Sequence, residues 1–155
     1  MKNNLRRPTW GVKTEWVPVQ ELPATPAGVK EIAIDLETKD PRLKTHGPGW
    51  PTGNGDVVGI AVAYDNFNAY LPFAHEGGGN LDRKRVLDWF KREIAKNPSD
   101  KIFYNAAYDV GWLKRLGIDL DGRIIDAMLA VPLLNENRFS YSLNSVSYDF
   151  TGQVK

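Results

Sequence analysis

The sequence predicts an α/β protein with a mixed β-sheet and helices on both of its faces. Apolar runs of strand length come first along the chain, and segments with helical periodicity then alternate with further short apolar strands. Strands joined by a tight turn pair antiparallel, whereas strands separated by a helix pair parallel. The order of these segments therefore favours one sheet of mixed direction packed against helices.

The size and composition of the chain fit one globular domain. Its 155 residues can bury a core, and 42% hydrophobic with 25% charged residues is ordinary for such a domain. The absence of cysteine excludes disulfides, thiolate nucleophiles and zinc–thiolate sites. No apolar run is long enough to span a membrane, and the polar, basic first residues do not resemble a signal peptide. We therefore expect a cytoplasmic protein with no membrane partner.

The net charge of the chain is only +1, which does not indicate blanket electrostatic attraction to nucleic acid. A polyanionic substrate would have to be held locally, or through metal ions that reverse the sign of an acidic pocket. The overall charge is therefore compatible with several functions and selects none of them.

Strand signals lie in the first half of the chain. Residues 1–27 contain several prolines and no sustained period, so we expect an arm over the domain, with a short strand at Thr14–Val19. The domain proper is expected to span residues 28–155. Its first three strands are expected at Glu31–Glu37, Val57–Tyr64 and Asn68–Phe73. Asp40–Asp56, rich in proline and glycine, is expected to be a surface loop of a length that is often functional or mobile.

Helical signals dominate the second half of the chain. Leu81–Lys96 is expected to be an amphipathic helix, with Asn80 as its N-cap and with Phe90 and Ile94 on its apolar stripe. The later elements are expected to be strand Lys101–Tyr104, helix Ala106–Leu116, strand Arg123–Asp126, helix Ala127–Asn135 and helix Ser140–Tyr148. This alternation of short strands and helices is the part of the sequence that favours parallel strand pairs.

Two carboxylates interrupt the first apolar strand. In EIAIDLETKD, residues 31–40, Asp35 and Glu37 are two positions apart and project from the same face, with Cα atoms about 7 Å apart. Like charges this close are unfavourable unless a cation lies between them, and hard divalent cations such as Mg²⁺ prefer oxygen ligands. Such a pair on its own more often caps a turn or faces solvent, but its apolar flanks here favour a metal site.

A second polar group lies at a predicted strand–helix junction. In IFYNAAYDVGWLKRLG, residues 102–117, Asn105 is placed to cap the helix, and Tyr108 and Asp109 follow it by three and four residues. All three side chains are therefore expected near the start of the helix. Asp109 taken alone is explained by the favourable interaction of an acid with the helix dipole.

Together the two segments resemble the 3′–5′ exonuclease (proofreading) domain of family A DNA polymerases, a DEDD exonuclease with a ribonuclease H-like fold. The resemblance rests on D-x-E-T at residues 35–38 and N-x-x-Y-D at residues 105–109, and covers about residues 28–150. The segments GRIIDAMLAVPLLN and YSLNSVSYDF resemble the parts that follow the second motif in the family. The loop sequence after Thr38 resembles that of bacteriophage polymerases.

The resemblance implies a reaction and a set of site residues. The reaction is hydrolysis of the 3′-terminal phosphodiester of single-stranded DNA with two divalent ions, Mg²⁺ or Mn²⁺, releasing nucleoside monophosphates. The implied catalytic and metal-binding carboxylates are Asp35, Glu37 and Asp109, and the implied contacts with the terminal nucleotides are Thr38, Asn105 and Tyr108. A polymerase domain, in the same longer chain or in trans, is the implied partner, and the host cytoplasm is the implied location of a phage protein.

The sequence departs from the family at the third motif. That motif is Tyr-x-x-x-Asp, or His-x-x-x-Asp in relatives, on a late helix, and it supplies the fourth carboxylate of the site. Neither Tyr141 nor Tyr148 has an aspartate four residues later, and neither do His46 and His75. We therefore expect the N-terminal part of a longer protein, or a chain that ends early, with a C-terminally incomplete fold. With three of the four carboxylates, the chain alone is expected to be a poorer nuclease than an intact domain.

Three alternatives remain open. A catalytically silent spacer or DNA-binding domain of a polymerase would bind no metal, and the combination of Asp35, Glu37 and Asp109 argues against it. A related DEDD exonuclease acting on RNA would carry the same motifs, because discrimination of the 2′-OH depends on pocket shape. A ribonuclease H-type endonuclease is the weakest alternative, since N-x-x-Y-D is not its pattern.

Overall fold

The computed structural model describes residues 19, 21–76 and 79–152. Within them the elements are, in chain order, β1 (Glu31–Lys39), α1 (Leu43–His46), β2 (Asp56–Tyr64), β3 (Phe67–Pro72), α2 (Arg83–Trp89), η1 (Phe90–Ala95), β4 (Asp100–Phe103), α3 (Ala106–Arg115), β5 (Ile124–Asp126), α4 (Ala127–Leu134) and α5 (Leu143–Thr151). The segment η1 is a π-helical turn that directly continues α2. The order of strands and helices agrees with the order that the sequence predicts, apart from the short α1.

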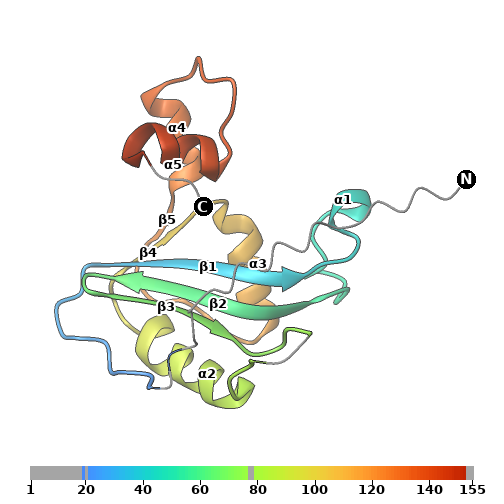
Figure 1. Cartoon of the computed structure of the whole chain (residues 1–155), viewed down its shortest axis with the longest axis vertical. Helices are drawn as coiled ribbons and strands as arrows, with labels where there is room; N and C mark the ends of the chain where they lie inside the picture. Colours follow the sequence, from blue (N-terminus) through green and yellow to red (C-terminus); the bar gives the residue numbers. More distant parts are fainter. Residues whose placement is uncertain (1–18, 20, 77–78, 153–155) are drawn as a thin grey trace, which may run out of the picture.

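The described strands form one five-stranded sheet in the order β3-β2-β1-β4-β5 (Figure 1). β2 is antiparallel to β1 and β3 is antiparallel to β2, whereas β4 is parallel to β1 and β5 is parallel to β4. The antiparallel pair joined by the tight turn (β2 and β3) and the parallel pair joined by α3 (β4 and β5) follow the expected rule. The predicted mixed α/β sheet is confirmed.

One face of the sheet holds the hydrophobic core. Alternate residues of β1, namely Ile32, Ile34 and Leu36, are buried on this face. Phe90 of η1 and Trp112 of α3 are buried in the same cluster, so α2, η1 and α3 cover this side of the sheet. Because strand residues alternate between the two faces, the residues between the core positions of β1 project from the opposite face.

The opposite face is lined by small residues. Ala33, Ala61 and Ala63 border an apolar cavity of about 510 Å³, which Ala127 of α4 and Leu143 of α5 also line. Figure 1 shows α4 and α5 beyond the ends of β4 and β5, and β5 leads directly into α4. Helices therefore border both faces of the sheet, although those near this second face reach only its margin.

The strand β1 runs well past the end of β4. The two strands pair only where Glu31–Ala33 lies opposite Asp100–Ile102, whereas β1 continues to Lys39. The chain turns into α3 directly after β4, so the start of α3 lies beside the edge of β1 that β4 does not cover. A register shift between Glu37 and Thr38 marks an irregularity in β1, of the kind that often accompanies functional sites.

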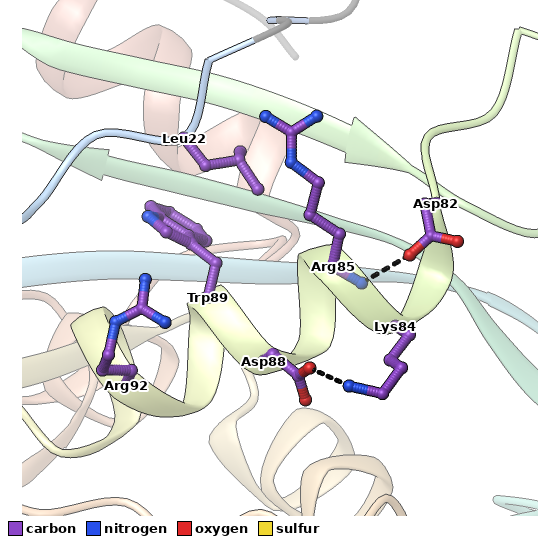
Figure 2. Close-up of a pocket in the computed structure, with 7 residues that line it drawn as sticks. All are labelled: Leu22, Asp82, Lys84, Arg85, Asp88, Trp89 and Arg92. Atoms are coloured by element: carbon purple, nitrogen blue, oxygen red, sulfur yellow. Dashed lines mark hydrogen bonds and ion pairs between the residues drawn. The ribbon is translucent and has the colours of Figure 1, made fainter.

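The first long helix differs from its predicted form at its start. Asp82, not Asn80, caps α2, and its Oδ1 accepts a hydrogen bond from the backbone N–H of Arg85 at 2.7 Å (Figure 2). Asn80 closes the preceding loop instead, through two hydrogen bonds of 2.8 Å with the backbone of His75. The predicted cap was wrong because an asparagine side chain serves a loop as readily as a helix end.

The described residues that precede β1 contact α2 and η1. The indole N–H of Trp89 donates to the carbonyl of Pro23 at 2.7 Å, and the backbone N–H of Thr25 donates to the carboxylate of Glu93 at 3.0 Å. Leu22 and Trp89 line one shallow pocket on this surface (Figure 2). The predicted strand Thr14–Val19 lies outside the described residues, apart from Val19.

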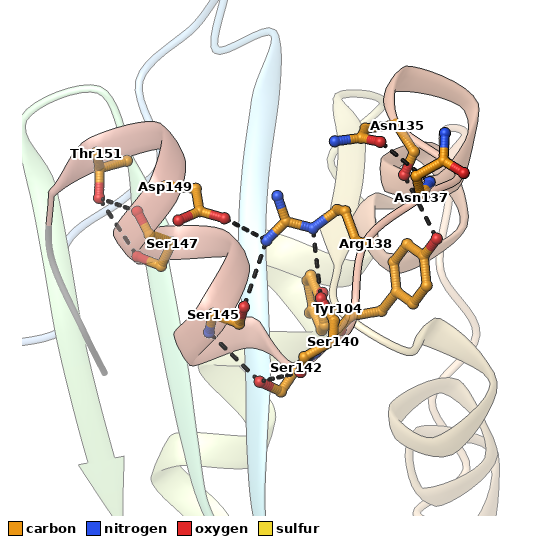
Figure 3. Close-up of polar contacts among 11 residues, drawn as sticks. Tyr104, Asn135, Asn137, Arg138, Ser140, Ser142, Ser145, Ser147, Asp149 and Thr151 are labelled. Atoms are coloured by element: carbon orange, nitrogen blue, oxygen red, sulfur yellow. Dashed lines mark hydrogen bonds and ion pairs between the residues drawn. The ribbon is translucent and has the colours of Figure 1, made fainter.

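Polar contacts hold α4 and α5 together as a hairpin. Ser142 caps α5, which therefore begins at Leu143 and not at Ser140. Arg138, in the connection, donates to Asp149 of α5 at 2.5 Å (Figure 3). The hydroxyl of Tyr104 donates to the carbonyl of Tyr141 and so ties the hairpin to the end of β4. None of the helices in the described part of the chain is long and apolar enough to cross a membrane.

Candidate active site

Asp35 and Glu37 lie on the face of β1 that is turned away from the hydrophobic core. Asp35 is half-buried and Glu37 is exposed. Their partners across the strand pair are Ala61 and Gly59, which offer a methyl group and no side chain. The backbone of β2 therefore leaves room beside both carboxylates on this face.

Asp109 reaches the same stretch of β1 from α3. It is only 4% exposed, and its Oδ1 accepts a hydrogen bond of 3.1 Å from the backbone N–H of Leu36. This N–H is on the part of β1 that extends past β4, where α3 replaces a strand neighbour. A buried carboxylate needs such donors to offset its loss of hydration. The bond places Asp109 next to the residue that separates Asp35 from Glu37.

The three carboxylates are neighbours but do not form a closed metal cage. Among the residues that the structure describes, no three carboxylate or imidazole side chains converge closely enough to hold one ion. Asp35 and Glu37 project from one face of the sheet, whereas Asp109 approaches from the strand edge. Carboxylate oxygens are nevertheless the ligands that Mg²⁺ and Mn²⁺ prefer. The donor chemistry of Asp35, Glu37 and Asp109 therefore fits divalent ions, although the three side chains do not surround one position.

Thr38 and Tyr108, both predicted to bind substrate, contact each other. The Thr38 and Tyr108 hydroxyl oxygens are 2.7 Å apart, and the Tyr108 hydroxyl also donates to Oδ2 of Asp40 at 3.2 Å. Burial raises the pKa of the Tyr108 phenol, and the hydrogen bond from Thr38 acts in the opposite direction. These bonds hold the end of β1 against the first turn of α3.

The loop after β1 is packed against α3. A Cβ atom added to Gly111, in the middle of α3, would lie 2.3 Å from the indole ring of Trp50. Only a glycine allows the indole this close to the helix backbone. Oδ2 of Asp40 accepts a hydrogen bond of 2.8 Å from the backbone N–H of Gly49, which closes the loop on itself. The segment that the sequence predicts as a surface loop is therefore attached to the helix that carries Asp109.

Asn105 occupies the N-cap position of α3 but its side chain makes no capping hydrogen bond. Its backbone is in the left-handed region, at φ 71°, which is uncommon for a non-glycine residue. The cap comes from Asp126 at the end of β5, which accepts from the backbone N–H groups of Asn105 at 3.0 Å and Ala106 at 2.8 Å. The predicted capping role of Asn105 is wrong, and its side chain is exposed beside a pocket that Asp35 also lines.

Tyr70 of β3 is a neighbour of the carboxylates that sequence reasoning did not identify. The pKa of its phenol is raised to about 12, first by burial and then by the negative charges of Glu37 and Asp35. Its hydroxyl is hydrogen-bonded to Nε2 of His75. The alternation of residues along β3 predicts which face Tyr70 occupies, but only the pairing of β3 with β2 and β1 shows which residues it approaches.

A mixed sheet with acidic side chains on its central strand, β1, and at the start of α3, the helix after β4, is typical of a ribonuclease H-like nuclease fold. A family model for the 3′–5′ exonuclease of family A DNA polymerases matches residues 17–155, and the chain belongs to this family. The family, the enzyme class and the DEDD type of exonuclease that the motifs predict are therefore confirmed.

Relatives in sequence are DNA polymerases. The chain is 35% identical over 142 residues to a DNA-directed DNA polymerase of Pseudomonas phage M6, covering 88% of the chain and 21% of that protein. It is 28% identical over 113 residues to DNA polymerase I of a Synechocystis strain, covering 64% of the chain and 12% of that protein. The chain thus spans about a fifth or less of the length of these relatives.

Similar solved structures share the fold at low sequence identity. NrnC of Brucella melitensis with bound Mg²⁺ has a TM-score of 0.58 and 14% identity, covering 83% of this chain and 56% of that one. RNase D of Trypanosoma brucei has a TM-score of 0.58 and 18% identity, covering 83% and 42%. These likenesses confirm the predicted ribonuclease H-like fold.

Proposed function

We propose that the chain carries the site of a proofreading 3′–5′ exonuclease that removes nucleoside monophosphates from the 3′ end of single-stranded DNA. The observation that carries the proposal is the hydrogen bond of Asp109 with the backbone of Leu36, between Asp35 and Glu37. It joins the two motifs, which lie more than seventy residues apart in sequence, at one point of the fold.

Each carboxylate has a separate task in the proposed reaction. Divalent ions, when bound, activate water and stabilise the charge that develops on the phosphate oxygens. Asp35 would be shared between two ions, and Glu37 would bind one of them and orient the attacking water. Asp109 would support the second ion from α3, in the orientation fixed by Leu36. Mg²⁺ and Mn²⁺ are the ions that this oxygen-rich donor set favours.

Three other residues are proposed to hold the 3′ end. Asn105 presents an exposed amide beside a pocket that also contains Asp35, so it can contact the terminal nucleotide. Thr38 and Tyr108 already hydrogen-bond each other and would offer the nucleotide a joint polar and aromatic surface. Their mutual bond positions them before substrate arrives, which reduces the cost of ordering on binding.

The relatives support DNA as the substrate and a polymerase as the partner. A DNA-directed DNA polymerase of a phage and a DNA polymerase I both contain a segment like this chain within a much longer protein. We therefore propose that the site works beside a polymerase domain, in the same longer chain or in trans. For a phage protein the place of action would be the host cytoplasm.

The proposal is tested by digestion of 5′-labelled single-stranded DNA and RNA of the same sequence by the purified chain, with Mg²⁺ or Mn²⁺. The expected result is slow 3′ shortening of DNA that stops with Asp35→Asn and with Asp109→Asn. Asp119→Asn, an exposed carboxylate on the loop after α3, is the matched control and should leave the rate unchanged. The chain lacks the Tyr-x-x-x-Asp or His-x-x-x-Asp motif that supplies the family's fourth carboxylate. A polymerase that contains this motif is therefore expected to digest the 3′ end faster.

Faster digestion of RNA than of DNA would favour the related RNA exonucleases, whose fold the chain shares. The absence of both metal binding and digestion would favour a silent spacer domain. Internal cleavage would contradict the exonuclease assignment.

A further inference from the structure

Tyr70 lies in the same cross-strand row as Asp35. In the register of the sheet, Asp35 pairs with Ala61, and Ala61 pairs with Tyr70. Residues that are directly opposite one another in adjacent strands project from the same face of the sheet. The phenol of Tyr70 and the carboxylate of Asp35 therefore share the face that also carries Glu37, with only the methyl group of Ala61 between their strands.

Gly59 gives the phenol a path towards Glu37. A Cβ atom added to Gly59 would lie 2.2 Å from the hydroxyl oxygen of Tyr70, so this hydroxyl lies directly over the glycine. Gly59 is in turn the cross-strand partner of Glu37. Adjacent strands are about 4.8 Å apart, so the hydroxyl lies over the strand position next to Glu37. Any larger residue at position 59 would push the phenol away from this place.

The phenol keeps its proton in this environment. The pKa of Tyr70 is raised to about 12, first by burial and then by the charges of Glu37 and Asp35. A phenol has one O–H donor, and that of Tyr70 faces two carboxylates, which accept hydrogen bonds. This electrostatic effect agrees with the position of the hydroxyl that the sheet register and Gly59 define.

A loop anchors the phenol from its other side. Nε2 of His75 is hydrogen-bonded to the Tyr70 hydroxyl, and the ring centroids of the two residues are 5.8 Å apart in an edge-to-face arrangement. Asn80 fixes His75 through two backbone hydrogen bonds of 2.8 Å. An ion pair between Lys39 of β1 and Glu76 attaches the same loop to the strand that carries Glu37.

We propose that Tyr70 is a positioning residue for Glu37: the imidazole N–H of His75 donates to the Tyr70 hydroxyl oxygen, and the hydroxyl proton is directed to the Glu37 carboxylate. A neutral imidazole has one N–H donor and a phenol has one O–H donor. If the imidazole donates to the phenol oxygen, the phenol proton is left to bond the Glu37 carboxylate. A carboxylate oriented by such a bond loses less freedom when it binds an ion. Only the expected effect on metal binding rests on the proposed function; the contact between Tyr70 and Glu37 does not.

The first test measures the effect of Tyr70→Phe on Mn²⁺ affinity of the purified chain, by electron paramagnetic resonance of free Mn²⁺. Loss of an outer hydrogen bond to a metal ligand costs about tenfold in affinity or more. We expect a dissociation constant about tenfold higher, and the same direction for Gly59→Ala, which displaces the phenol without removing it. Tyr64→Phe is the matched control, because this tyrosine is buried on the core side and stacks on Phe67. An unchanged affinity in Tyr70→Phe would overturn the proposal.

The second test needs no metal. The ¹³C resonance of the Glu37 carboxylate carbon is assigned by its loss in Glu37→Gln. This resonance should shift in Tyr70→Phe and in His75→Ala but not in Tyr64→Phe. If the wild-type chain binds no Mn²⁺ while this shift is present, the proposed function fails and the contact stands. If the resonance does not move in Tyr70→Phe, Tyr70 does not position Glu37 and the proposal fails, whatever the metal affinity.

A kinetic test separates a positioning role of Tyr70 from a role in folding. In a longer polymerase that degrades DNA, Tyr70→Phe should lower kcat of the exonuclease about tenfold and leave KM for the DNA end unchanged. A change in KM alone would assign Tyr70 to substrate binding and contradict its role towards Glu37.

Discussion

Asp126 sets the geometry of the candidate site without lining it. Its carboxylate accepts from the backbone N–H groups of Asn105, Ala106 and Met128, so a single side chain caps the starts of both α3 and α4. The left-handed backbone of Asn105 costs on the order of 1–3 kcal/mol, which these bonds offset. The sequence around Asn105 contains no sign of this cap, because the acceptor comes from another strand. Prediction from the local pattern therefore assigned the cap to the wrong side chain.

Replacement of this cap should affect both stability and the site. We expect Asp126→Ala to lower the free energy of unfolding by about 2 kcal/mol, at the upper end for a helix cap because two helices lose their acceptor. Equilibrium unfolding in urea measures the change, with Asp119→Ala as the control at an exposed carboxylate. A loss no larger than that of the control would mean that water replaces Asp126 at both helix ends.

Lys101 is a second residue whose role the pattern of apolar strand residues does not show. It is 0% exposed, and its ammonium donates to the carbonyl oxygens of Asn97, Ser99 and Asp121 at 2.7, 2.7 and 2.9 Å. Burial lowers its pKa from the ordinary value of 10.5, and the nearby charges of Asp121 and Asp100 oppose this. The residue therefore joins the start of β4 to the chain segments on either side of it.

This lowered pKa gives a pH test with a defined sign. Unfolded Lys101 keeps its proton to a higher pH than folded Lys101, so the unfolded chain binds more protons and stability rises with pH in that interval. Lys101→Met should lower the free energy of unfolding by about 2 kcal/mol, because it leaves buried carbonyls without a donor. The gap between wild type and variant should widen between neutral pH and pH near 10. A gap that narrows in urea unfolding would mean that the carbonyl oxygens favour the charged form more than burial disfavours it.

At the scale of elements, periodicity predicts what is local and fails where distant elements meet. The three early strands and the apolar stripe of the first long helix follow from residue spacing, and the structure has them. The packing of Trp50 on Gly111 does not follow from spacing, since a glycine in a helix reads only as a weak helix former. The same limit applies to Asp109: helix-dipole complementarity explains its type, but only the overhang of β1 shows that it bonds to Leu36.

The contact between Trp50 and Gly111 can be tested by whether Gly111→Ala raises or lowers the stability of the chain. Alanine is a better helix former than glycine by up to about 1 kcal/mol, so Gly111→Ala should stabilise α3 if nothing lay against it. Because the added Cβ would lie 2.3 Å from the indole, Gly111→Ala is expected to destabilise the wild-type chain. In a Trp50→Ala background the same change should be neutral or stabilising. Equal effects in both backgrounds, measured by thermal unfolding, would show that the loop does not rest on α3.

At the scale of the whole molecule, the change of strand direction creates the site. Three antiparallel strands precede β4 and β5, which add parallel to the far edge of β1. Because β4 ends while β1 continues, α3 meets the open part of β1 and delivers Asp109 there. The sequence order is enough to predict the mixed sheet and the approximate place of the motifs. The relative approach of the three carboxylates depends on strand lengths and registers, which no single segment of the sequence specifies.

The same arrangement places two like charges close together, and the resulting loss of stability can be measured. Asp35 and Glu37 carry like charges on one face, so Asp35→Asn should raise the free energy of unfolding without metal by roughly 0.5–1 kcal/mol. A ligand that binds only the folded chain stabilises it, so millimolar Mg²⁺ should raise Tm of the wild type. It should not raise Tm of Asp35→Asn, and Asp119→Asn should behave as the wild type does. If Asp35→Asn instead destabilises the metal-free chain, Asp35 contributes to folding. Its charge on β1 would then not be a source of repulsion that metal binding relieves.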